Sequence, residues 1–172
     1  AVSGTLTGNT VYSNATGIFM QNAGVALGNL VYGNSTQGVR IYSSNGTQFI
    51  GNTIYQSAGN ALTLDTNSDN VTLLDNVFWA TSGAAISVAA DSQDGFTSDF
   101  NIFQGTVGIW QGVSQTSLAA WRNAAFTDAN SIHADPLFVD IDGADGVLGY
   151  SNLVADGRDD DFHLKSVHGS FH

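Results

Sequence analysis

The chain has 172 residues, which is enough for one domain with a continuous core, and a hydrophobic content of 42% excludes a chain that is disordered by composition. Fifteen acidic against four basic residues give a net charge of −11, so nucleic acid and anionic membranes are poor partners. The absence of cysteine excludes disulfides, and no apolar run approaches the roughly 18 residues of a membrane span.

A repeated string marks the regular part of the chain: an asparagine, any residue, an apolar residue and an aromatic one. It occurs in residues 8–12, 28–32, 51–55 and 75–79, and a fifth copy at 99–103 is slipped by one residue. The intervals of 20, 23, 24 and 24 residues match the length of one solenoid coil.

Each repeat carries further short strands. Second strands are predicted at 17–20, 38–42, 61–65, 85–89 and 108–111, and third strands at 47–50 and 71–74. Three strands per coil predict an all-β fold, a right-handed parallel β-helix of about five or more coils, because a single coil cannot bury its apolar face but stacked coils can. The alternative is a β-sandwich with accidental spacing.

The repeated asparagines are expected to stack between coils. Asn9, Asn29, Asn52 and Asn76 would form one buried or half-buried ladder at a bend, with Cα atoms about 5 Å apart. Asparagine also tolerates the left-handed backbone of such a bend.

The period fails after Gln111. Residues 116–122 predict a short capped helix, 130–139 lead into an acidic, glycine-rich loop, and 161–165 form a last strand-like piece. We expect one domain over residues 1–172, with regular coils in 1–111 and irregular coils and a cap in 112–172. Either the chain is a fragment of a larger protein or a neighbour completes its end.

The strings SDFNIF, SLAAWRNAAFTDANSIHADPLFVD and DDDFHLKS, together with the coils, carry a family resemblance. The chain resembles the right-handed parallel β-helix superfamily that includes pectate lyases, and in particular the β-helix repeat modules of large bacterial secreted and surface proteins. The resemblance implies an extracellular or cell-surface location. It implies no single activity, because the superfamily hosts lyases, hydrolases, epimerases, adhesins and passive stalks.

The outward face of the second strands holds a weak catalytic candidate. If Val39 and Ile41 point inward, then Arg40 and Tyr42 point outward, with Asp65 one coil away and Trp110 further along the same face. A β-elimination lyase needs a base and a cation beside the uronate carboxylate, roles that Arg40 and Tyr42 could fill while Asp65 holds Ca²⁺. The alternative is a surface ion pair beside a stacked tyrosine.

The aromatic position of the repeat offers a binding surface. One aromatic per coil would form a file that binds sugar rings or another protein. Its members are Tyr12, Tyr32, Tyr55, Trp79 and Phe103. The alternative is ordinary stacking that stiffens the solenoid.

The acidic loop is the candidate metal site. Asp140, Asp142 and Asp145 alternate with other residues beside glycines, a pattern that suits Ca²⁺, although the terminal bidentate glutamate of an EF-hand is missing. The alternative is a solvated acidic loop. No other cofactor is expected.

The features together favour an extracellular structural or adhesive module. Residues 1–7 enter the first coil without charge or proline, so the open end could pair head to tail with another copy and build filaments. The alternatives are a lyase acting on acidic glycans and a non-catalytic carbohydrate-binding module. The expected partners are therefore the chain itself or an extracellular polysaccharide, without nucleic acid or membrane insertion.

Overall fold

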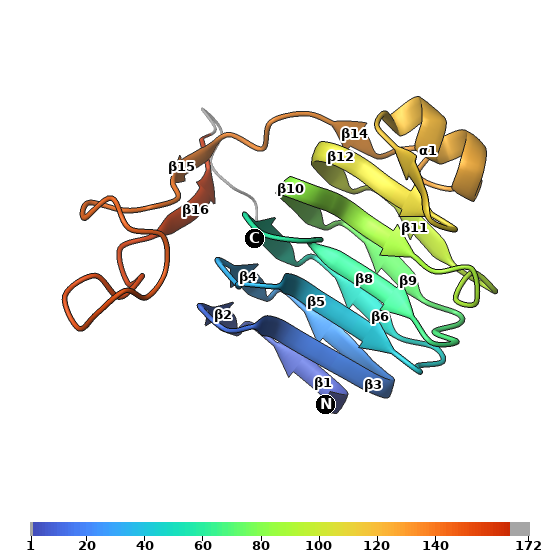
Figure 1. Ribbon diagram of the computed structural model, residues 1–172, viewed down its shortest axis with the longest axis horizontal. Coiled ribbons are helices and arrows are strands. Elements are labelled where there is room, and N and C mark those ends of the chain that lie inside the picture. The colour runs from blue at the N-terminus through green and yellow to red at the C-terminus, as the bar shows by residue number, and fades with distance from the viewer. Residues whose placement is uncertain (1, 166–172) are drawn as a thin grey trace. The chain divides into compact units, whose positions relative to one another are not determined.

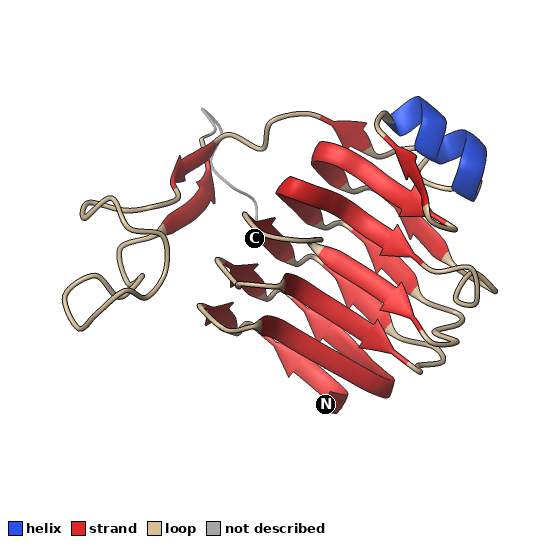
Figure 2. Ribbon diagram, viewed as in Figure 1, coloured by secondary structure: helices blue, strands red, loops and turns tan. Residues whose placement is uncertain are grey.

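The computed structural model describes residues 2–165 and consists mainly of short parallel strands, with one helix (Figure 1, Figure 2). It forms two compact units, Ala1–Ala134 and Asp135–His172, which we describe separately. The first unit is a parallel β-solenoid of about five coils, as the repeat predicted, with a short helix near its C-terminal end. No helix among residues 2–165 is long and apolar enough to cross a membrane.

The strands of the first unit stack on three faces, in parallel register except for β13. One face contains β1 (Val2–Thr7), the end of β3 (Thr16–Leu27), β6 (Gln48–Ile50), β9 (Thr72–Leu74) and β11 (Thr97–Asp99). The next contains β2 (Thr10–Tyr12), β4 (Leu30–Tyr32), β7 (Thr53–Gln56), the start of β10 (Val77–Val88), the start of β12 (Ile102–Trp110) and β14 (Ile132–His133). The third contains the start of β3, β5 (Gln37–Tyr42), β8 (Leu62–Asp65) and the ends of β10 and β12. β13 (Val113–Gln115) pairs antiparallel with β12.

The core fills the inside of the coils. Alternation along each strand turns every second side chain inward, and equivalent residues then stack from coil to coil, as Val39, Leu62 and Ile86 do. Phe49, Phe78 and Phe103 form an internal aromatic stack with ring centroids 6.3 and 5.9 Å apart. These side chains are fully buried, so hydrophobic burial per coil drives the stacking.

The predicted asparagine ladder is present and extends one coil further, to Asn101. In each step the Oδ1 atom accepts two hydrogen bonds, from the backbone N–H and the Nδ2 of the asparagine one coil earlier, over 2.9–3.1 Å. The left-handed residue of the bend is not the asparagine, however. It is the residue before it, which is Gly8, Gly28, Gly51, Asp75 or Phe100, with φ of 56–63°.

The other two corners carry shorter polar ladders. The backbone N–H of Asn14 donates to Asn34 Oδ1 over 3.0 Å, and that of Asn34 donates to Gln56 Oε1 over 3.4 Å. At the third corner the backbone N–H of Ser68 donates to Ser92 Oγ over 3.0 Å. Side chains at the bends thus accept hydrogen bonds from backbone N–H groups that have no partner in the strand pairing.

Helix α1 (Leu118–Ala125) covers the last coil, at the opposite end of the solenoid from β1 (Figure 1). Ser117 caps it by accepting from the Ala120 N–H over 3.2 Å. Its buried Trp121 packs edge-on against Trp110 and Phe96, with centroids 5.6 and 6.3 Å apart. Gly108 makes room for this ring, since a Cβ there would lie 2.3 Å from it.

The ladder ends under this helix on a buried carboxylate, Asp128. Its Oδ2 accepts from Trp121 Nε1 over 2.7 Å, and its Oδ1 accepts from Ser98 Oγ, Asn101 Nδ2 and Ser131 Oγ over 2.5–3.2 Å. Ser131 replaces the next asparagine and accepts the Asn101 backbone N–H over 2.8 Å. The last coil is therefore closed by polar groups whose hydrogen bonds are complete, beneath the buried Trp121 of helix α1.

The second unit is a small hairpin-like element with long loops. β15 (Phe138–Asp140) pairs antiparallel with β16 (Asp161–Leu164), and Phe138 packs edge-on against Phe162 at 5.1 Å between centroids. The predicted strand at 161–165 is thereby confirmed as β16. Residues 166–172 of the predicted cap lie outside the described residues.

Candidate functional site

The structure brings Arg40, Tyr42 and Asp65 together on the outside of the third face. Arg40 and Tyr42 lie on β5, and Tyr42 is in register with Asp65 on β8. The guanidinium of Arg40 donates to both carboxylate oxygens of Asp65 from Nε and Nη2, over 2.9–3.2 Å. Its Cζ atom lies 4.8 Å from the ring centroid of Tyr42 and 5.8 Å from that of Phe19.

This geometry forms a neutral platform. The paired guanidinium rests on two aromatic rings whose centroids are 5.7 Å apart, and about a third of the Arg40 side chain is exposed. Because the charge of Arg40 is already matched by a bidentate carboxylate, the arginine is a poor neutraliser for a uronate carboxylate. Asp65 is likewise engaged, which leaves less of its charge to hold Ca²⁺.

Trp110 does not belong to this face, contrary to its predicted position. It lies in register with the inward-facing Val88, and Ile109 is the residue that stands beside Ser87. The register of β12 against β10 shifts between Trp79 and Ala84, and this irregularity turns the tryptophan inward, where it packs on Trp121.

The predicted aromatic file is present over four coils and does not continue into the fifth. Tyr12, Tyr32, Tyr55 and Trp79 are in continuous register, but the next position is Gln104. Including Phe103 in the file was wrong: it pairs with Phe78 and is fully buried in the core. The register follows the asparagine, and Asn101 has one residue fewer before its aromatic than the other repeats have.

The file is also less accessible than a sugar-binding ladder requires. Tyr12 and Tyr32 stack at 4.9 Å between centroids, and Tyr55 meets Trp79 edge-on at 5.0 Å. Tyr32 is 1% exposed and Tyr55 is 8% exposed, whereas Tyr12 and Trp79 are partly exposed. Binding by this file therefore stays a prediction, with its two middle members covered.

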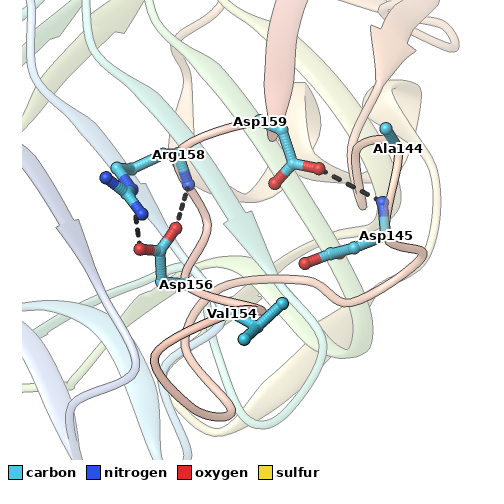
Figure 3. Close-up of a pocket in the computed structure, with 6 residues that line it drawn as sticks. All are labelled: Ala144, Asp145, Val154, Asp156, Arg158 and Asp159. Atoms are coloured by element: carbon cyan, nitrogen blue, oxygen red, sulfur yellow. Dashed lines mark hydrogen bonds and ion pairs between the residues drawn. The ribbon is translucent and has the colours of Figure 1, made fainter.

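The acidic loop does not converge on a point. Among the described residues no three His, Asp or Glu side chains lie close enough together to hold a metal ion. Asp140 lies on β15, in register with Asp161. Asp145 is bound locally, with its N–H donating to Asp159 Oδ2 over 3.1 Å, as Figure 3 shows. Calcium binding by Asp140, Asp142 and Asp145 remains a prediction that would need the loop to rearrange.

A shallow depression lies in the second unit, lined by Ala144, Asp145, Val154, Asp156, Arg158 and Asp159 (Figure 3). The Arg158 Nε lies 2.6 Å from Asp156 Oδ2, and this hydrogen bond holds the pKa of the Asp156 carboxyl below its ordinary value. Both groups of the pair are therefore engaged with each other. The depression is open and remains acidic, since Asp145, Asp156 and Asp159 face the single cation Arg158, which suits a solvated loop.

Sequence reasoning missed the most connected polar cluster, which is the buried Asp128 with its partners. The available signal was the position three residues before each ladder asparagine. It is apolar in the first four coils, at Leu6, Ala26, Phe49 and Leu73, and becomes Ser98 and then Asp128 at the end. This cluster closes the solenoid, so we assign it a structural role.

Residues 1–135 match the family model for a right handed beta helix region. Searches of curated proteins and of solved structures found no match. The matched segment spans well over half of the 172 residues and coincides with the stacked coils. The chain belongs to the right-handed β-helix family.

Proposed function

We propose that this chain is a structural module of an extracellular protein, a rigid solenoid that presents its sides for adhesion. One observation carries the proposal: five asparagines, one from each coil, are joined by paired hydrogen bonds along one corner of the solenoid. Such a ladder, together with a core that stacks without interruption, makes the rod stiff along its length. A stiff spacer with polar edges suits a surface protein.

The paired state of Arg40 supports a non-catalytic role over the lyase alternative. Arg40 is the one arginine or lysine on the stacked strands of the described residues, and Asp65 occupies the Nε–Nη2 edge of its guanidinium. In an elimination reaction a substrate carboxylate would compete with Asp65 for the charge of the arginine.

An assay of turnover and adhesion tests the proposal. Pectate and alginate should show no rise in the absorbance of unsaturated products, while the protein should adhere to a surface coated with extracellular polysaccharide. Asn52→Ala, which breaks the ladder, should weaken the rod without affecting any catalytic group. Turnover that disappears in Arg40→Ala would refute the proposal and favour a lyase.

A second candidate, carbohydrate binding without catalysis, has one favourable observation. Phe19 and Tyr42 are partly exposed beside the Arg40–Asp65 pair, and a flat aromatic next to polar groups is suited to a sugar ring. Glycan arrays with the wild-type chain and with Tyr42→Ala test it. Loss of a bound glycan in Tyr42→Ala, with an unchanged melting temperature, would support this candidate.

A further inference from the structure

The two ends of the solenoid differ in how their hydrogen bonds are completed. At one end Ser131 and Asp128 replace the ladder asparagine and satisfy Asn101, beneath helix α1. At the other end lie the outer edges of β1 and β2, which we call the first-coil face. Among residues 2–165 nothing pairs with these edges, since β1 pairs with β3 alone and β2 with β4 alone.

Burial shows that the first-coil face is incomplete. Leu6 is only partly buried, whereas the residue stacked on it, Ala26, is fully buried. Val11 is likewise partly buried, whereas Val31 above it is fully buried. Asn9 is exposed, but the next four ladder asparagines are buried. The reduced burial is confined to the first coil, so one further layer would bury Leu6, Val11 and Asn9.

The hydrogen bonds of Asn9 specify what that layer must offer. Each inner ladder asparagine receives two donors on Oδ1 from the coil before it, and its Nδ2 donates to a carbonyl of that coil. That carbonyl always belongs to the residue three positions before the earlier asparagine, as with Leu6 for Asn29 and Ala26 for Asn52. Asn9 Nδ2 instead turns back to its own Thr7 carbonyl over 3.2 Å, and no described residue donates to its Oδ1.

We propose that the first-coil face is a docking surface for one more parallel β-coil that carries the pattern apolar-x-x-Asn-x-apolar. The asparagine of that coil donates hydrogen bonds from its backbone N–H and its Nδ2 to Asn9 Oδ1. The apolar residues of the coil cover Leu6 and Val11. The carbonyl of the residue three positions before its asparagine accepts a hydrogen bond from Asn9 Nδ2. This contact is independent of the adhesive role proposed above, because it concerns the end of the solenoid and not its sides.

A second copy of the chain fits this face less well than such a coil. In a head-to-tail contact the copy would have to offer its last coil, which is closed by α1 and by Asp128. In a head-to-head contact the strands would run antiparallel and the two Asn9 Oδ1 atoms, both acceptors, would meet. The occupant is therefore an open coil of another β-helical segment.

The structure provides the test, because Gly4 lies in register with Gly24. A chain made of residues 1–23 followed by residues 4–172 adds one coil through a junction that reproduces Ala23–Gly24. We expect its melting temperature to exceed that of the 1–172 chain by at least about 3 °C. We also expect backbone amides of the original β1 and β2 to exchange with deuterium at least about tenfold more slowly.

The matched control carries Asn9→Ala in the added coil only, and it should recover about half of the gain or less. An added coil that neither raises the melting temperature nor protects β1 and β2 overturns the proposal. Equal gains with and without the asparagine overturn its hydrogen-bond specificity. Oligomers of the 1–172 chain in light scattering that dissociate in Leu6→Lys would show that a second copy occupies the face, and would also overturn it.

Discussion

Replacing one rung of the asparagine ladder should cost far more in the middle than at the open end. Asn52 is buried, and its Oδ1 accepts from the N–H and Nδ2 of Asn29 over 2.9 Å. Its Nδ2 shares two hydrogens among Ala26 O, Ile50 O and Asn76 Oδ1 over 3.0–3.1 Å. Asn52→Ala therefore leaves buried donors and acceptors without partners on both neighbouring coils.

The magnitude follows from these contacts. A buried polar group left unpaired costs about 1–3 kcal/mol, so at least two such groups give a loss of about 4 kcal/mol in the free energy of unfolding. For a chain of this size that loss lowers the melting temperature by about 10 °C. Asn9→Ala deletes two donated hydrogen bonds at an exposed position, where water replaces them, and should cost about 1 kcal/mol or less.

Thermal and urea unfolding of the two variants measure the difference. Asn52→Leu is the control for packing, because it keeps the number and branching of the side-chain heavy atoms, in a somewhat larger group, and removes the hydrogen bonds. It should be destabilised nearly as much as Asn52→Ala. Equal losses for Asn9→Ala and Asn52→Ala, or recovery in Asn52→Leu, would refute the view that buried hydrogen bonds hold the coils in register.

Three further outcomes are expected. Phe100→Gly should raise the free energy of unfolding by about 1 kcal/mol, because a bulky residue at φ 57° is strained and 56% exposed; a loss in urea unfolding would contradict this. Burial raises the pKa of Asp99, but hydrogen bonds from Asn130 and Phe100 outweigh it and hold that pKa below 3.8. Its contribution to stability is therefore present above pH 3.8 and lost as pH falls through the lowered folded pKa, so Asp99→Asn should lose less stability on acidification; unchanged acid titrations would refute this. If residues 140–146 bind Ca²⁺, EDTA should lower the melting temperature, and no shift at millimolar Ca²⁺ would leave them a solvated loop.

The site was only partly predictable from the sequence. Alternation along β5 correctly placed Arg40 and Tyr42 outside, and the coil interval brought Asp65 beside them. The bidentate contact between Arg40 and Asp65, which makes the pair electrically neutral, depends on side-chain rotamers. The repeat period of the sequence does not specify these rotamers. The acidic loop illustrates the same limit of sequence-based prediction. The spacing of its aspartates can be read from the sequence, whereas their convergence on a metal ion depends on the geometry of the folded loop.

The repeat was sufficient to predict the solenoid and its asparagine ladder. A recurring Asn-x-apolar string at nearly constant intervals permits one way to bury every apolar face, which is to stack coils with asparagines aligned. It was less reliable where the interval held but the string slipped, as at Phe103, because register follows hydrogen bonds and not similarity of letters. The difference between the two ends appears only in the folded chain: Asp128 joins Asn101 to Trp121, while the Asn9 Oδ1 accepts from no described residue. Closing an end of the solenoid depends on packing between residues far apart in the chain and on which polar groups find hydrogen-bond partners. Local sequence patterns contain neither kind of information.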